Sequence, residues 1–118
     1  LIYERLGIYF EESKPFLDGN LGISDVAKAL FTNKAYLSRS INMYAGRNFC
    51  QYVNYFRIKY SIECFTEDPT LRIAALAQMS GFNSTTSFNM AFKLYMNEAP
   101  SEWCRRNRDM ICVKGLKK

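Results

Sequence analysis

An apolar and polar pattern that occurs twice, with an offset of about 50 residues, constrains this chain most. Each copy has a short helical pattern, a tight turn and a second helical pattern. The matching positions are Ile23, Val26, Ala27, Asn33, Leu37, Ile41 and Tyr44 in the first copy, and Ile73, Leu76, Ala77, Ser84, Phe88, Phe92 and Tyr95 in the second. No stretch alternates for long enough to predict a strand. The sequence therefore predicts an all-α fold that contains one helical unit in duplicate.

Caps and helix breakers predict about seven helices. They are expected at residues 2–17, 25–31, 34–44, 48–66, 73–79, 84–96 and 100–109. Ser24 and Asn33 are the expected caps of the second and third helices, and Gln51 completes a capping-box pattern with Asn48. We expect three parts: residues 1–47 with the first duplicated unit, a linking helix at 48–66, and residues 67–118 with the second unit and a basic C-terminal tail.

Composition and charge set broad limits. The 118 residues are 48% hydrophobic and 15% aromatic, enough for one compact domain or two small units that share a helix. The net charge of +5 weakly favours a polyanionic partner, and the basic end of the chain is equally well explained as a solvated tail. No apolar run approaches the roughly 20 residues of a membrane helix, and no signal peptide is evident. Because the first residue is Leu1, we expect a piece of a longer protein.

The sequence offers little for catalysis or metal binding. Histidine is absent and the four cysteines form no CxxC pair, so neither a zinc site nor a Cys/His nucleophile is predicted. We expect no cofactor and no enzymatic activity. Cys50, Cys64 and Cys104 lie in helical patterns and are expected to be buried or half-buried in a reduced, cytoplasmic protein.

The second helix of each copy has one apolar and one polar face. A short helix, a turn and a second helix form a helix-turn-helix, whose second helix presents its N-terminal residues to the major groove of DNA. Leu37, Ile41 and Tyr44 face inward in the first copy, and Phe88, Ala91, Phe92 and Tyr95 in the second. The outward residues are Ala35, Ser38, Arg39 and Asn42, and Thr85, Thr86, Asn89, Met90 and Lys93. The short hydroxyls before Phe88 exceed what one cap requires, and this indicates an external contact.

Duplex DNA also requires phosphate contacts, which helix N-termini and basic side chains supply. The candidates are Asn33, Lys34, Arg47, Asn48, Arg72, Ser84, Lys93, Ser101 and Arg105.

Several motifs carry a family resemblance over roughly residues 8–106. The second copy, LRIAALAQMSGFNSTTSFNMAFKLYMNEAPSEW, contains I-x-x-(L/I)-A, G-F, F-x-x-x-F-K, and a proline followed by S-x-(Y/W). The first copy contains Y-L-S-R and G-x-x-F, and Arg57 and Ile58 supply R-(L/I) in the linking helix. The chain resembles the DNA-binding domain of AraC/XylS-type bacterial transcription regulators. Phe31 departs from a usual glycine, Arg72 from a usual Ser or Thr cap, and Ser61 from a usual alanine.

The resemblance implies two helix-turn-helix subdomains that regulate bacterial transcription. Its implied partners are double-stranded DNA, bound through the major groove in two adjacent turns, and RNA polymerase. The implied base contacts are Ala35, Ser38 and Arg39 in the first copy, and Thr85, Thr86, Asn89 and Met90 in the second. Arg39 suits guanine or phosphate, and Asn89 suits adenine. A sensor or effector domain is expected outside this chain; the signal, the operator and the direction of control stay open.

The linking helix suggests how one duplex is bound. A helix of about 19 residues is roughly 28 Å long, near the ~34 Å between successive major grooves. Two alternatives remain open. One is a helical module that binds protein through Tyr3, Tyr9, Tyr55 and Tyr60. The other is RNA binding, although no aromatic pair is evidently placed for base stacking.

Overall fold

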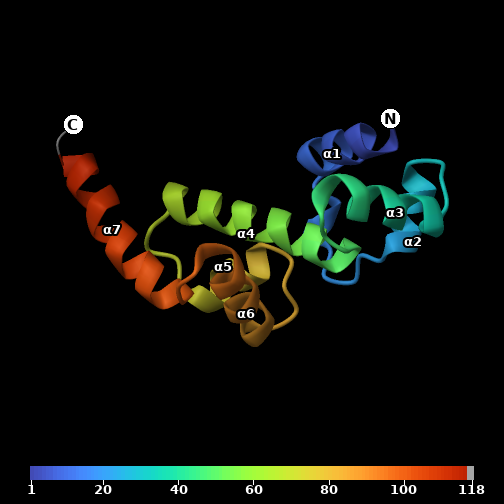
Figure 1. The fold of residues 1–118 in the computed structure, drawn as a ribbon. Coiled ribbons are helices and arrows are strands. Elements are labelled where there is room, and N and C mark those ends of the chain that lie inside the picture. Colours follow the sequence, from blue (N-terminus) through green and yellow to red (C-terminus); the bar gives the residue numbers. More distant parts are fainter. Residues whose placement is uncertain (117–118) are drawn as a thin grey trace. The chain divides into compact units, whose positions relative to one another are not determined.

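The computed structural model describes the backbone of residues 1–116 and the side chains of residues 1–110. The elements are α1 (Ile2–Ser13), a 3-10 segment η1 (Pro15–Leu17), α2 (Ile23–Ala29), α3 (Lys34–Ala45), α4 (Phe49–Glu67), α5 (Ile73–Met79), α6 (Thr85–Met96) and α7 (Pro100–Leu116). The described backbone contains no strand, so the predicted all-α class and the seven helices are confirmed (Figure 1).

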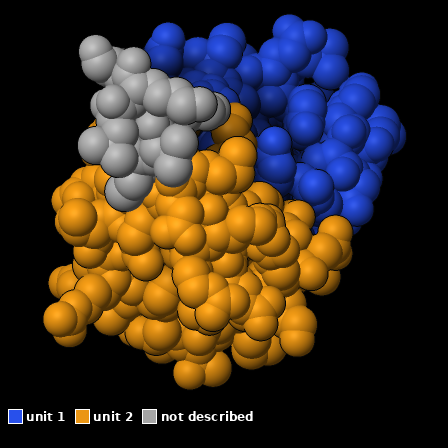
Figure 2. Space-filling model, turned by 90° about the vertical axis from the view of Figure 1, so that its left-hand side faces the viewer, with its two compact units in different colours: residues 1–56 blue, residues 57–118 orange. Residues whose placement is uncertain are grey.

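The chain divides into two compact units, Leu1–Phe56 and Arg57–Lys118, which we call unit 1 and unit 2 (Figure 2). Helix α4 contributes its first residues to unit 1 and the remainder to unit 2. Each unit contains one copy of the duplicated pattern: α2 and α3 in unit 1, and α5 and α6 in unit 2.

Aromatic and aliphatic side chains fill the core of unit 1, where α1 and α2 pack against α3. Phe10 is fully buried, and its ring centroid lies 5.2 Å from that of Tyr52 and 5.1 Å from that of Phe56. Arg5 Nη2 donates a 2.7 Å hydrogen bond to the carbonyl of Leu30, at the end of α2. Helix α1 therefore supports the segment that leads into α3.

Unit 2 has its own core, made by the second part of α4 with α5, α6 and α7. Phe65 and Phe92 are buried there, and the Trp103 ring lies 5.6 Å and 5.7 Å from their centroids. Arg108 Nε donates a 2.8 Å hydrogen bond to the carbonyl of Pro69, which connects α7 to the loop before α5. Helix α7 thus supports unit 2.

Three predicted helix boundaries were wrong. The last helix, α7, continues to Leu116 rather than ending at residue 109. The first helix ends at Ser13 because Pro15 cannot continue it, and Lys14 adopts a left-handed conformation with φ 49°. Helix α2 begins at Ile23, with Gly22 rather than Ser24 at the N-cap. The Asp25 carboxylate accepts a 3.0 Å hydrogen bond from the Gly22 N–H, and this contact fixes the start two residues earlier.

The other cap predictions are confirmed. Asn33 Oδ1 accepts from Tyr36 N at 2.9 Å. The side chains of Asn48 and Gln51 bond each other's backbone N–H groups at 2.8 Å and 2.9 Å, a complete capping box at the start of α4. Gly46 ends α3 with φ 66°.

The small polar and sulfur-containing side chains differ in burial. Ser61 is buried and donates a 2.7 Å hydrogen bond to the Ile58 carbonyl, so this serine satisfies its hydroxyl within α4. Cys64 and Cys104 are buried, and burial raises the pKa of both thiols. Cys50 is exposed, which corrects the expectation of burial, and the Cys112 side chain lies outside the described residues. Over the part of the chain that was searched, no helix is long and apolar enough to cross a membrane.

Candidate nucleic-acid interface

The start of α6 resolves why so many short polar residues precede Phe88. Ser84 Oγ accepts from Ser87 N at 3.1 Å and lies 3.0 Å from Ser87 Oγ, so Ser84 is the N-cap. One cap accounts for one hydroxyl. Thr85 and Thr86, in the first turn, remain exposed at the surface.

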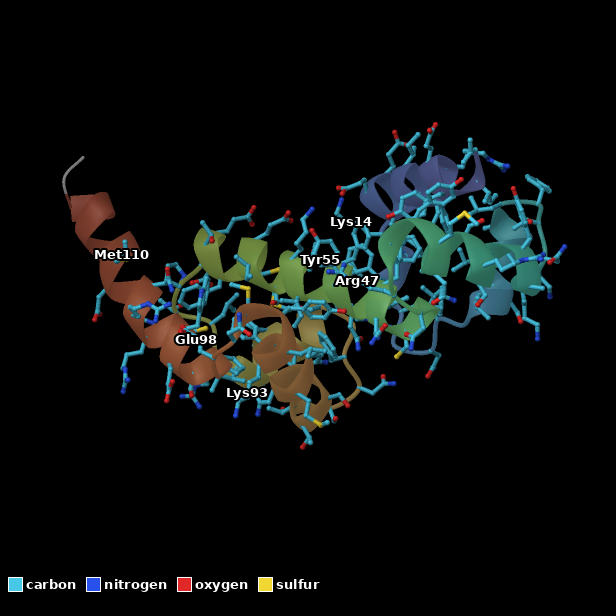
Figure 3. All side chains as sticks on the ribbon, in the orientation of Figure 1. Lys14, Arg47, Tyr55, Lys93, Glu98 and Met110 are labelled. Carbon is cyan, nitrogen blue, oxygen red and sulfur yellow. The ribbon has the colours of Figure 1, made fainter. Side chains whose placement is uncertain are left out.

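Helix α6 has a buried face and an exposed face. Phe88, Ala91 and Phe92 are buried in the core of unit 2. The predicted contact residues all lie on the exposed face: Thr85, Thr86, Asn89, Met90 and Lys93. Lys93 extends outward from α6 in Figure 3. Tyr95, expected to face inward, is only partly buried and packs at the edge of the core.

Helix α3 has the same two faces in unit 1. Leu37, Ser40 and Ile41 are buried. Lys34, Ala35, Arg39 and Asn42 are exposed, and Ser38 is half-buried. Asn42 Nδ2 donates a 3.0 Å hydrogen bond to the Ser38 carbonyl, so this amide group is held against its own helix.

Tyr44 does not face the core, contrary to expectation. It is 54% exposed, and its ring centroid lies 5.4 Å from that of Tyr3. The residues on the apolar face of α3 are buried as far as Ile41. In the last turn of the helix, Tyr44 packs against Tyr3 at the surface instead.

Both exposed faces favour an anionic ligand. Neither α3 nor α6 contains an acidic residue. Lys34 and Arg39 carry positive charge on α3, and Lys93 does so on α6. The positive end of each helix dipole lies at the same end as most of the outward polar residues.

The remaining phosphate candidates have different surroundings. Asn33, Asn48 and Ser84 use side-chain oxygens as helix caps. The Arg47 guanidinium lies 4.7 Å from the Tyr55 ring centroid, and Figure 3 shows these two side chains together. Arg72 occupies the N-cap position of α5 without a side-chain cap bond, and it is exposed. Ser101 and Arg105 are exposed on α7.

The unusual Phe31 does not alter the hydrogen bonds of the first turn. Phe31 N donates to Lys28 O at 3.2 Å, as Gly81 N does to Gln78 O in the second turn. Phe31 has φ 56° and is 92% exposed. The first turn therefore follows the standard path with a residue that is poorly suited to it.

Two exposed apolar residues near these faces were missed. Met43 and Leu94 are 72% and 66% exposed. Met43 lies four residues after Arg39, and Leu94 lies four residues after Met90. Helical periodicity alone therefore places both residues on the same exposed faces as these predicted contacts.

Comparison with known proteins agrees with this geometry. A family model described as a helix-turn-helix domain matches residues 26–106. The Msm operon regulatory protein of Streptococcus mutans is 30% identical over 84 residues, which cover 71% of this chain and 30% of that protein. The matched part of this chain therefore covers less than a third of that relative's length.

Solved structures show the same fold. The C-terminal domain of AraT, a response regulator from Geobacillus stearothermophilus, is 28% identical with a TM-score of 0.76, covering 89% of this chain and 84% of that one. The DNA-binding domain of AdpA, solved in complex with a target DNA, has a TM-score of 0.74 over 92% of this chain and 94% of its own. At 14% identity the AdpA likeness shows the fold alone.

The family consists of transcription regulators and not of enzymes. The chain belongs to the AraC-type helix-turn-helix family, the DNA-binding domains of bacterial transcription regulators.

Proposed function

We propose that this domain binds one non-palindromic site in duplex DNA, with α3 and α6 each in a major groove of two adjacent turns. The observation that carries the proposal is the matching pair of helix faces: each is exposed and free of acidic residues, opposite a face buried in its own core. The exposed side chains of α3 differ from those of α6. Two helices with different side chains recognise different base sequences, so the two half-sites must differ. The AdpA domain, bound to its target DNA, shares this fold.

The proposed base contacts are Ala35, Ser38, Arg39 and Asn42 from α3, and Thr85, Thr86, Asn89 and Met90 from α6. The proposed phosphate contacts are Asn33, Lys34, Arg47, Asn48, Arg72, Ser84, Lys93, Ser101 and Arg105. In this proposal residues 48–66 link the reading units at 1–47 and 67–118. The protein acts in the cytoplasm and controls RNA polymerase.

The protein-binding alternative relied on Tyr3, Tyr9, Tyr55 and Tyr60. Tyr3 packs against Tyr44 and Tyr52, and Tyr55 packs edge-on against Phe56. Tyr9 packs edge-on against Phe10, and Tyr60 packs against the core of unit 2. Because these rings have internal packing roles, they do not favour a partner groove.

Selection of sites from a random duplex pool by the 118-residue chain tests the proposal. Arg39→Ala is expected to relax selection at one base pair and Asn89→Ala at another, each with a loss of about 1–3 kcal/mol in discrimination. Lys34→Ala is the matched control on α3; it is expected to weaken all sites alike and to reduce the salt dependence by about one unit of slope. Unchanged selection by both Arg39→Ala and Asn89→Ala would refute the assigned contacts.

A further inference from the structure

The exposed face of α6 is divided along its length. Residues four apart lie above one another on a helix. Thr86, Met90 and Leu94 thus form a stripe that offers methyl, thioether and isobutyl groups, and Met90 and Leu94 are 70% and 66% exposed. Thr85, Asn89 and Lys93 form a polar stripe beside it. Met90 and Leu94 also line one shallow surface hollow with Lys93 and Asn97.

The equivalent stripe of α3 has a different chemistry. Ala35, Arg39 and Met43 occupy the positions that correspond to Thr86, Met90 and Leu94. The central residue is thus a charged hydrogen-bond donor in unit 1 and an apolar thioether in unit 2. A methionine side chain has no donor, and its sulfur is only a weak acceptor. Met90 therefore cannot recognise the acceptors of guanine, which suit Arg39.

The major groove of DNA contains one apolar group, the C5 methyl of thymine. We propose that α6 selects thymine through this methyl group, with Met90 as the main contact and Thr86 and Leu94 extending the apolar stripe. The inference rests on the proposed entry of α6 into the major groove. Lys93, beside Met90, and the absence of acidic residues on α6 make this apolar stripe compatible with a polyanion.

The decisive experiment removes the methyl group from the DNA. In a duplex selected by the chain, each thymine of the half-site that depends on Asn89 is replaced in turn by deoxyuridine, which keeps every hydrogen-bonding group. Binding is expected to weaken about fourfold at one or more positions, the value for one buried methyl or methylene group. Deoxyuridine at thymines outside both half-sites is the internal control.

Protein variants assign the effect to Met90. Met90→Ala is expected to abolish the difference between thymine and deoxyuridine at one position. Lys93→Ala, the matched control on the same face, is expected to weaken both duplexes equally. Met90→Arg places the residue of the equivalent Arg39 position in α6, and it is expected to change the selected base from thymine to guanine.

The possible failures are distinguishable. If Asn89→Ala and Lys93→Ala weaken binding but no thymine methyl matters, or Met90→Ala keeps the full difference, methyl recognition is overturned and groove entry stands. If none of the Asn89, Met90 and Lys93 variants changes binding, α6 does not enter the groove, and the proposed function fails together with this inference.

Discussion

The turns that lead into α3 and α6 share their hydrogen bonds but place their aromatic residues oppositely. In unit 1, Phe31 stands at the left-handed position with φ 56° and is 92% exposed. In unit 2, Gly81 stands at that position with φ 92°, and the aromatic residue is the next one, Phe82, which is 7% exposed.

Backbone hydrogen bonds set the path of both turns. Thr32 N donates to Ala27 O at 2.9 Å, and Phe82 N donates to Ala77 O at 3.0 Å. The Phe82 ring also lies 5.4 Å from that of Phe88 and below the Arg57 guanidinium, at 5.6 Å. In unit 2 side-chain packing therefore adds to these hydrogen bonds, whereas in unit 1 the path includes an unfavourable backbone conformation.

The largest expected difference comes from Phe82→Ala. Removing this buried ring leaves a cavity and is expected to lower the free energy of unfolding of unit 2 by about 3–5 kcal/mol. Urea denaturation followed by the fluorescence of Trp103, the single tryptophan, measures it, because Trp103 packs against the core of unit 2. Thr32→Ala is the matched control in unit 1, followed by far-UV circular dichroism because Trp103 reports on unit 2, with an expected change of about 0.5 kcal/mol or less. A Phe82→Ala loss as small as that would contradict the anchoring role.

Local signals predicted most of the fold. The cap at Asn33, the capping box of Asn48 with Gln51, and Gly46 are determined by residues within one turn of each helix end, so sequence alone suffices. The start of α2 was misplaced because Ser24 is not the N-cap; the Asp25 carboxylate accepts a hydrogen bond from the Gly22 N–H instead. The exposure of Tyr44 depends on its contact with Tyr3, which is distant in sequence. Helical periodicity within α3 cannot predict such a contact.

The candidate interface was predictable to a similar extent. Helical periodicity placed Arg39, Asn89 and Met90 at the surface, because the opposite faces are visibly apolar. It did not reveal that the Asn42 amide bonds its own helix, since this depends on a side-chain rotamer. The strain at Phe31 was signalled only by departure from a family glycine.

An intermediate effect is expected from Gly81→Ala. An L-residue in the left-handed region costs about 1–2 kcal/mol, partly offset by the smaller entropy of its unfolded chain, so unit 2 should lose about 1 kcal/mol. The same fluorescence titration measures the loss. Gly7→Ala is the matched control, because Gly7 lies within α1 and an added Cβ would meet nothing within 4 Å. That change is expected to stabilise by about 0.5–1 kcal/mol in a far-UV circular dichroism melt. Destabilisation by both substitutions would show that backbone conformation is not the cause.

The smallest effect is expected from Phe31→Gly, and its sign is opposite to the signs for Phe82→Ala and Gly81→Ala. Glycine relieves about 1–2 kcal/mol of left-handed strain but adds about 0.5–1 kcal/mol of unfolded-chain entropy, so unit 1 should gain about 0.5–1 kcal/mol. Amide hydrogen exchange of α2 and α3 detects this gain locally.

Phe31→Ala separates the backbone from the ring. Alanine keeps an L-residue at φ 56° and removes only a side chain that is already 92% exposed, so little change is expected. A gain with alanine equal to that with glycine would assign the cost to the exposed ring instead. A loss of stability with glycine would mean that the Phe31 ring contributes packing to unit 1. Aromatic packing would then stabilise both turns, and they would differ only in how much it contributes.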